Sequence, residues 1–281
     1  MKSSSKLASF VNQMPDPDDR GMYCTDIDKE KIEKAIAQIH KGGRGNIIAI
    51  IDMLIPPGEG DDVKAHYALH CLALYVCGLD DDNRRRRFAR TLASQLGGSR
   101  PKAVQRYLVR VLQVAGGREV VGALGALLLD EELCEPAAQA LVAIGDGAAK
   151  QLRDALPRAG GKCRLTIVQN LGVVRDVESV DALKKAITDE DSDVRIAAAW
   201  ALANIGDPGS ATVLLRPTDA QGWERIQMTK ACLLLAENLR AAGKNSEAVK
   251  IYTHLRDTRT EPAESYVRDA AKKALTAAGG K

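Results

Sequence analysis

The sequence has 281 residues and a formal net charge of +3 at pH 7, which is too small to indicate a partner by itself. Apolar residues make up 45% of the chain but aromatic residues only 4%, which favours closely packed helices over a large aromatic core. No run approaches the roughly 18 apolar residues that a membrane span requires, and residues 1–15 lack the apolar segment of a signal peptide. We therefore expect a soluble cytoplasmic protein with no membrane contact, although a chain from which an export signal had been removed would look the same.

Residues 1–26 are polar, contain Pro15 and Pro17, and are expected to form a flexible lead-in. Residues 27–281 are predicted to form a single solenoid of paired helices. The pairs are predicted at 28–41 with 46–55, 62–77 with 83–96, 101–115 with 119–129, 135–144 with 147–156, 162–174 with 177–187, 193–205 with 209–215, and 223–242 with 246–256. The apolar run 47–51 has strand propensity, but its place between helical segments favours a helix. A last helix at 263–278 is polar and Lys-rich on one side, as expected of a terminal cap.

An internal repeat determines the predicted architecture. Arg164, Arg195 and Arg225 are 31 and 30 residues apart, and each lies six residues ahead of a similar apolar cluster. The same register continues through Lys64, Gln105, Glu135 and Arg268. A helical pattern of this period predicts an all-α fold, an α-α superhelix of about seven pairs plus a capping helix, because one pair cannot bury its apolar face alone.

Two apolar positions recur three residues apart within the repeats, on one helix face. The first position holds Leu141, Leu171, Leu202 and Cys232, and the second holds Ile144, Val174, Ile205 and Leu235. These positions are predicted to form one continuous core. Trp200 and Trp223 also fall at apolar helical positions and are expected in the core.

The segment Asp193-Val194-Arg195-Ile196-Ala197-Ala198-Ala199-Trp200-Ala201-Leu202-Ala203-Asn204-Ile205-Gly206-Asp207 resembles a HEAT-like repeat of the type found in phycobilisome lyases. Residues 62–68 and 266–275 are similar to its opening, and residues 140–146 to its close. The resemblance implies a right-handed superhelix and, since the family consists mostly of adaptors and scaffolds with few enzymes, a role in binding. Glu135 and Gln105 depart from the pattern by replacing its basic residue.

Two recurring polar columns are interpreted as structural. Asp146, Asp176 and Asp207 lie at the turn inside each pair, where aspartate can cap the next helix and favour its dipole. Arg164, Arg195, Arg225 and Arg268 are predicted to form a hydrogen-bonding ladder between repeats.

Catalytic and metal signatures are weak in this sequence. His66 and His70 have the i, i+4 spacing of a metal site, with Cys71 and Cys77 near, but no Glu follows either histidine and no third ligand is placed. HEAT-type hydroxylases related to the deoxyhypusine enzyme carry repeated His-Glu pairs, which this chain lacks. Residues 42–45 are Gly-rich but lack the P-loop context. We predict a non-enzyme with no catalytic residue, metal or cofactor, and six free thiols in a reducing compartment.

Positive charge is concentrated between Arg84 and Arg118, where there are ten Lys or Arg and no carboxylate, whereas Glu119 to Asp219 has sixteen carboxylates against ten basic residues. The Asp80-Asp81-Asp82 run offsets part of the cost of cations at a helix start. If the two basic helices are neighbours, their side chains form one patch. The predicted patch consists of Arg84, Arg85, Arg86, Arg87, Arg90, Lys102, Arg106 and Arg110.

Three interpretations of the patch remain open: a merely solvated face, a contact for an acidic protein, or a contact for nucleic acid. Aromatic residues near it are few (Phe88, Tyr107), which argues against single-strand stacking. Our main hypothesis is a monomeric, non-catalytic scaffold that uses this patch and the concave surface of its second helices, with Arg84, Arg87, Arg106 and Arg110 touching a partner of acidic surface. Replacing Arg84 to Arg87 with Glu is expected to abolish binding with little change in melting temperature. The alternatives are a nucleic-acid binder resembling the HEAT-like alkylpurine DNA glycosylases, and a bilin lyase or its chaperone subunit.

Overall fold

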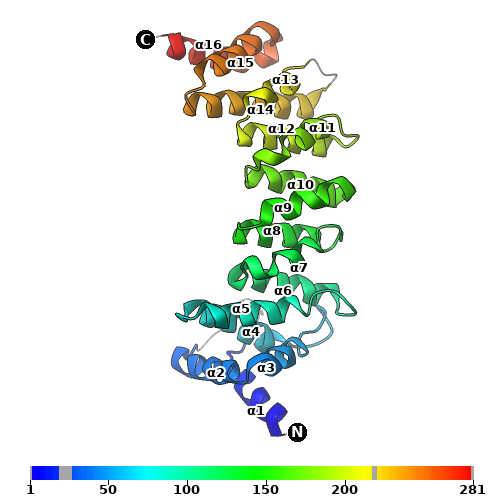
Figure 1. Cartoon of the computed structure of the whole chain (residues 1–281), viewed down its shortest axis with the longest axis vertical. Helices are drawn as coiled ribbons and strands as arrows, with labels where there is room; N and C mark the ends of the chain where they lie inside the picture. The colour runs from blue at the N-terminus through cyan, green and yellow to red at the C-terminus, as the bar shows by residue number, and fades with distance from the viewer. Residues whose placement is uncertain (1, 19–26, 217–219, 280–281) are drawn as a thin grey trace. The chain divides into compact units, whose positions relative to one another are not determined.

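The computed structural model describes residues 2–18, 27–216 and 220–279 (Figure 1). The chain divides into two compact units, Met1–Gln151 and Leu152–Lys281. Every regular element in the described residues is helical, which confirms the all-α class. Successive helices pack as pairs against the pairs before and after them within each unit, as in a HEAT-like solenoid. The extent of one solenoid over 27–281 stays a prediction. No helix in these residues combines the length and apolarity that a membrane crossing requires.

The N-terminal unit contains two rows of helices. Its helices are α1 (Lys2–Val11), α2 (Lys29–Lys41), α3 (Gly43–Ile51), α4 (Val63–Gly78), α5 (Asp82–Ala93), α6 (Lys102–Ala115), α7 (Val121–Gly125) and α8 (Cys134–Ile144). The first helices of the pairs, α2, α4, α6 and α8, pack successively against one another, and the second helices α3 and α5 pack against each other. Helix α3 settles the ambiguous apolar run, since Ile47, Ile50 and Ile51 are buried on a helix.

The N-terminal segment differs from the expected flexible lead-in. Residues 2–11 form α1, which packs against α2 and α4. Leu7, Val11 and Met14 are buried, with at most 5% of each exposed. These apolar side chains integrate the segment into the first repeat, while residues 19–26 of the expected lead-in lie outside the described residues.

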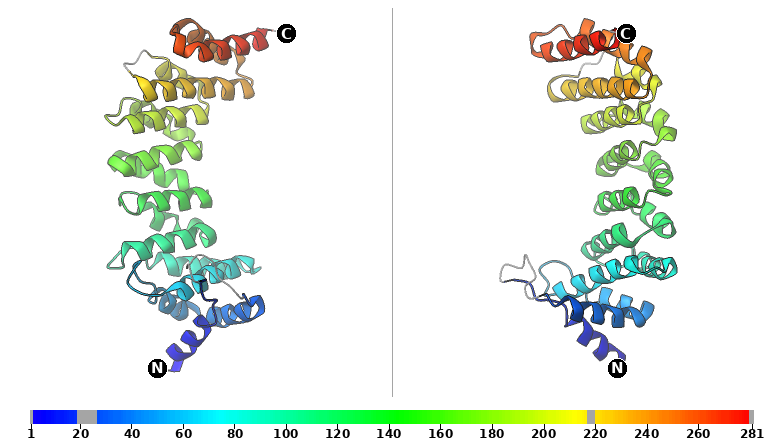
Figure 2. Two further views of the ribbon diagram at one scale, coloured as in Figure 1. Left: turned by 180° about the vertical axis from the view of Figure 1, so that it is seen from behind. Right: turned by 90° about the vertical axis from the view of Figure 1, so that its left-hand side faces the viewer.

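The C-terminal unit repeats the same arrangement. Helix α9 (Ala148–Ala155) spans the boundary, and α10 (Gly161–Val173), α11 (Val180–Ala186), α12 (Ser192–Ile205), α13 (Ala211–Leu214), α14 (Gly222–Ala241), α15 (Asn245–Thr258) and α16 (Ser265–Gly279) follow. Helices α10, α12 and α14 lie side by side in one row (Figure 2). The second helices α11 and α13 are shorter than predicted, because each is entered through a 3-10 turn, Val177–Ser179 and Pro208–Ser210.

Small residues set the close spacing of the row. A Cβ on Gly172 of α10 would lie 2.7 Å from both Cα and Cβ of Ala201 on α12. The first predicted core position is fully buried, with at most 1% of Leu141, Leu171, Leu202 and Cys232 exposed. At the second position, Leu235 is buried but Ile144, Val174 and Ile205 are half-buried.

The prediction that Trp200 and Trp223 lie in the core is wrong. Trp223 is 66% exposed and Trp200 is 39% exposed. Trp223 lies in the first turn of α14, and Lys230 of the same helix approaches its ring, with Nζ 5.7 Å from the ring centroid. The Trp200 ring lies against Gly172 of α10, where a Cβ would be 2.9 Å from Cζ3 of the indole, so this ring is packed on one side and exposed on the other.

Candidate functional site

The arginine column is a structural ladder in the C-terminal unit, as predicted. Three of these guanidinium groups bind a carboxylate near the first helix of the following pair. The carboxylate lies either just ahead of that helix or in its first turn. The ion pairs are Arg164–Asp189 (2.6 Å), Arg195–Glu224 (2.6 and 2.7 Å) and Arg225–Glu264 (2.8 and 2.8 Å). Arg268 instead donates to the carbonyls of Arg259 and Glu261. These contacts engage all four arginines within the fold, which supports the structural interpretation of the column.

The turn aspartates form a second set of ion pairs. Each pairs with a basic residue of the preceding second helix or of the 3-10 turn that leads into it. The pairs are Arg118–Asp146 (3.7 Å), Arg153–Asp176, and Lys184–Asp207 (3.2 Å). Asp176 was expected to cap the following helical turn, but its side chain makes no cap hydrogen bond there. The aspartates thus contact neighbouring repeats, and Asp207 also accepts a hydrogen bond from Ser210 Oγ at 3.1 Å in the turn that follows it.

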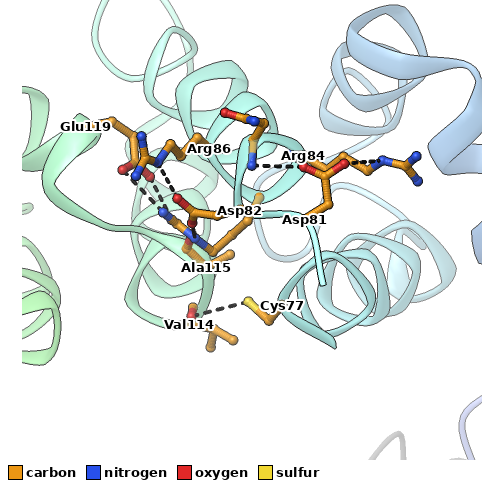
Figure 3. A network of polar contacts seen from close by, with 10 residues as sticks. Cys77, Asp81, Asp82, Arg84, Arg86, Val114, Ala115 and Glu119 are labelled. Atoms are coloured by element: carbon orange, nitrogen blue, oxygen red, sulfur yellow. Dashed lines mark hydrogen bonds and ion pairs between the residues drawn. The ribbon is translucent and has the colours of Figure 1, made fainter. Parts of the chain in front are cut away.

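The start of α5 carries the first four arginines of the predicted patch. Asp81 is the N-cap residue, and its carboxylate accepts hydrogen bonds from the backbone N–H groups of Asn83 (3.1 Å) and Arg84 (3.3 Å) (Figure 3). The same carboxylate pairs with Arg84 Nε at 2.9 Å, and Asp82 pairs with Arg86 Nε at 2.5 Å. The acidic run thus offsets the cost of cations at this helix terminus, as the sequence indicates.

Arg85 has a different role from its neighbours. Its Nη1 donates to Glu119 Oε1 at 2.7 Å and to the carbonyl of Ala115 at 2.8 Å, and its Nε binds Asp82 at 2.8 Å. Only 8% of the Glu119 side chain and 20% of the Arg85 side chain are exposed. The hydrogen bond to Glu119 raises the pKa of Arg85. Replacing Arg84 to Arg87 together would remove this connection, so the structure favours a fall in the melting temperature of that variant, whereas the sequence favoured little change.

A basic cleft of about 660 Å³ lies between α5 and the junction of α2 and α3. The cations at its surface are Lys41 and Arg44 on one side and Arg84, Arg87 and Arg90 on α5. Its other lining residues are His40, Gly43, Ile47, Phe88 and Thr91. Within the described part of the chain, no carboxylate lines this cleft.

Local backbone features create the two walls. Residues 84, 87 and 90 are spaced three apart on α5, so neighbouring members lie within one helical turn of each other. The opposite wall turns sharply at Gly43, where φ is +61°. Gly42 lies against the Asn46 side chain, since a Cβ there would be 1.9 Å from Asn46 Nδ2, and that amide donates to the Ile39 carbonyl at 3.0 Å.

Sequence reasoning missed one wall of this cleft. Lys41, Arg44 and His40 belong to the preceding repeat, in or beside the Gly-rich residues 42–45 that lack the P-loop context. The available signal was the placement of basic residues on both sides of a Gly-Gly turn. Arg44 also reaches toward α5, with its Nη2 3.4 Å from Ser94 Oγ.

The α6 members of the predicted patch do not line the cleft. Lys102 pairs with Asp130, and Arg106 Nη2 lies 3.9 Å from Glu132. Arg110 is exposed. Helix α6 belongs to the row of first helices and α5 to the second row, and the two helices pack against each other.

His40 brings a titratable group to the cleft. Its ring centroid lies 5.5 Å from that of Tyr75, at 57°. Burial, followed by the charge of Arg84, lowers the pKa of His40 below its usual value of 6.5, while Asp81 opposes this. The lowered pKa favours the neutral imidazole, which can donate or accept a hydrogen bond.

Of the two histidines on α4, His66 is engaged in packing and His70 is exposed. His66 Nε2 lies 3.1 Å from Asp62 Oδ2, and its ring meets the Tyr107 ring edge-on at 4.0 Å. The Tyr107 hydroxyl donates to the His66 carbonyl at 2.5 Å, and burial raises the tyrosine pKa. The described residues contain no group of three or more His, Cys, Asp or Glu side chains arranged to hold a metal ion.

The sequence comparison supports the repeat assignment. Residues 150–231 match the family model of HEAT repeats, and no curated protein matches the chain. Solved structures similar to this chain include an engineered protein at 21% identity and TM-score 0.48, covering 97% of this chain and 78% of that chain. Human deoxyhypusine hydroxylase in complex with glycerol is similar at 14% identity and TM-score 0.35, covering 99% and 98%. A second engineered protein is 20% identical with TM-score 0.30, covering 97% of both chains.

Proposed function

Because this chain is a HEAT-like repeat protein, we propose that it is a non-catalytic interaction scaffold whose basic cleft binds an acidic segment of a protein partner. The supporting observation is that four of the five cations at the cleft have no ion pair with a described residue. Lys41, Arg44, Arg87 and Arg90 form no ion pair with any described residue, whereas the basic residues of the inter-repeat ladders are paired with carboxylates.

The contrast between the two sets of cations supports a binding role for the cleft. Clustering like charges costs free energy that a bound anion offsets, and complementary charge speeds and orients association. The ladder arginines are already neutralised within the fold. A partner with carboxylates on an exposed segment would complete the pairing that the fold itself omits at the cleft.

The test is capture of partners from native lysate by the tagged full-length chain and two charge-reversal variants. Arg87→Glu changes an exposed cleft residue, and Arg110→Glu is the matched control, because Arg110 is equally an exposed arginine on a helix but lies outside the cleft. We expect a defined protein that survives nuclease treatment, is retained by Arg110→Glu and is lost with Arg87→Glu.

Two outcomes would contradict the proposal. Loss of all capture after nuclease treatment would assign the cleft to nucleic acid, and a steep fall of affinity with salt for an oligonucleotide would support that reading. Equal capture by the wild-type chain and Arg87→Glu would remove the cleft from the binding surface.

A further inference from the structure

We propose that the acidic segment is phosphorylated, and that the cleft holds its phosphate monoester between α5 and the α2–α3 junction. This inference rests on the proposed function and adds the chemical class of the ligand. It starts from the amount of positive charge around one cavity, five Lys and Arg side chains in about 660 Å³.

Charge balance favours a multivalent anion. Of the five cations, Arg84 already has Asp81 as a partner, which leaves Lys41, Arg44, Arg87 and Arg90 to be neutralised. A single carboxylate carries one negative charge, whereas a phosphate monoester carries roughly 1.5 to 2 at neutral pH and three strong acceptor oxygens. A phosphate at one position therefore neutralises more of the positive charge of this cleft than an Asp or Glu side chain does.

The types of hydrogen-bond donor at the cleft also favour a phosphate. Four of the five cations are arginines, and the planar guanidinium matches phosphate oxygens with two parallel N–H groups. The cations come from two facing walls, so one tetrahedral anion can be contacted from both sides. Clusters of arginine are a recurring means of recognising phosphorylated motifs, and His40 at the same cleft adds a hydrogen-bonding group.

The cleft fits a phosphorylated segment better than a nucleic acid. A polynucleotide needs a basic track along which successive phosphates are neutralised. The α6 cations that could extend the track include Lys102 and Arg106, which face Asp130 and Glu132. The aromatic ring at the cleft, Phe88, is 2% exposed and offers no stacking surface.

A membrane surface is also a poorer match. Basic membrane-binding surfaces generally combine cations with apolar side chains that enter the lipid. The exposed large apolar residues of this unit are Ile27, Leu74, Val114 and Leu129, and none of these lines the cleft. The cations here surround a recess of a size usual for small-ligand sites, roughly 300–1,000 Å³.

The experiment compares two degenerate peptide libraries that differ only at the central residue, phosphoserine or serine, for binding to the full-length chain. Peptides enriched from the first library are then synthesised with phosphoserine, serine or aspartate and measured by fluorescence anisotropy. We expect the phosphoserine form to bind at least about tenfold more tightly than either other form. Arg87→Gln and Arg44→Gln should each weaken it by about tenfold, with no change for Arg110→Gln. Inorganic phosphate should compete.

The outcomes separate this inference from the proposed function. Equal binding of the three synthetic forms would overturn the phosphate inference and leave an acidic-segment scaffold intact. Enrichment of no peptide from either library, together with binding of an oligonucleotide or of vesicles containing a phosphoinositide, would overturn both. Equal loss of affinity in Arg110→Gln and Arg87→Gln would place the phosphate outside the cleft, and circular dichroism of each variant would exclude unfolding as the cause.

Discussion

Arg195 and Glu224 form a two-point ion pair across the contact of α12 and α14, with Nε–Oε1 at 2.6 Å and Nη2–Oε2 at 2.7 Å. Their side chains are 26% and 16% exposed. Arg195 also donates to the carbonyls of Asp189 and Glu190 just ahead of α12. The Arg195 guanidinium thus connects the residues just ahead of α12 to the first turn of α14. The neighbouring Arg225–Glu264 pair has the same two-point geometry.

The Arg195–Glu224 pair should contribute measurable coupling. We predict that Arg195→Ala and Glu224→Ala each lower the free energy of unfolding, and that a double-mutant cycle gives a coupling of about 1 kcal/mol, because the pair is bidentate and only partly exposed. Urea denaturation of the four proteins supplies the cycle. A coupling indistinguishable from zero would show that the ladder does not hold the repeats together.

The ladder also makes stability depend on pH. The hydrogen bonds from Arg195 and Arg225 lower the pKa values of Glu224 and Glu264 from the usual 4.5. Since the unfolded chain binds these protons more readily, the stabilisation is complete above about pH 4.5 and is lost as the pH falls through the lower folded-state values. We predict that the urea midpoint of the wild-type chain falls on acidification in this range, and falls less in the Glu224→Gln/Glu264→Gln variant. Parallel pH profiles would refute the assignment.

Two adjacent arginines of α5 should behave differently. Arg85→Met leaves Glu119, 8% exposed, and the Ala115 carbonyl without the Arg85 guanidinium, so we predict a loss of about 2–3 kcal/mol. Arg86→Met removes the same charge from a side chain that is 51% exposed, and should change the urea midpoint little. Similar midpoints for the two variants would show that the Arg85 contacts are unimportant for stability.

Two glycines test the close spacing of helices. Gly172→Ala would place a Cβ 2.7 Å from Ala201, so overpacking should destabilise the chain by about 1–3 kcal/mol despite the better helix propensity of alanine. Gly122→Ala is the control, because Gly122 is exposed on α7 and a Cβ there meets nothing within 4 Å. It should leave stability unchanged or raise it by up to about 1 kcal/mol. Thermal unfolding of both variants distinguishes steric from conformational effects.

The charge of the cleft should be detectable at His40. Arg84 is one cause of the lowered His40 pKa, after burial, and Asp81 opposes it. Arg84→Gln removes the cation and frees Asp81, so we predict a higher His40 pKa. An NMR titration of the imidazole in the wild-type chain and in Arg84→Gln measures the shift. A lower pKa in the variant would contradict the electrostatic description of the cleft.

The sequence alone predicted the class of fold, the helix pairs and the arginine ladder. A 30-residue period with apolar residues three apart requires stacked helical pairs, because each pair exposes an apolar face until its neighbours cover it. The ladder followed from the same register, since residues at equivalent positions of adjacent repeats face equivalent neighbours, as Arg195 and Arg225 do.

The positions of side chains across repeats were decided only by the tertiary structure. Helices α5 and α6 pack against each other, but the α6 cations do not line the cleft, and Arg85 and Lys102 are used in ion pairs within the fold. Lys41 and Arg44, some forty residues before the run, complete the cleft instead. Periodicity specifies which face of a helix is buried, but the partners of the exposed face depend on which helices pack together, and that depends on the three-dimensional stacking of the repeats.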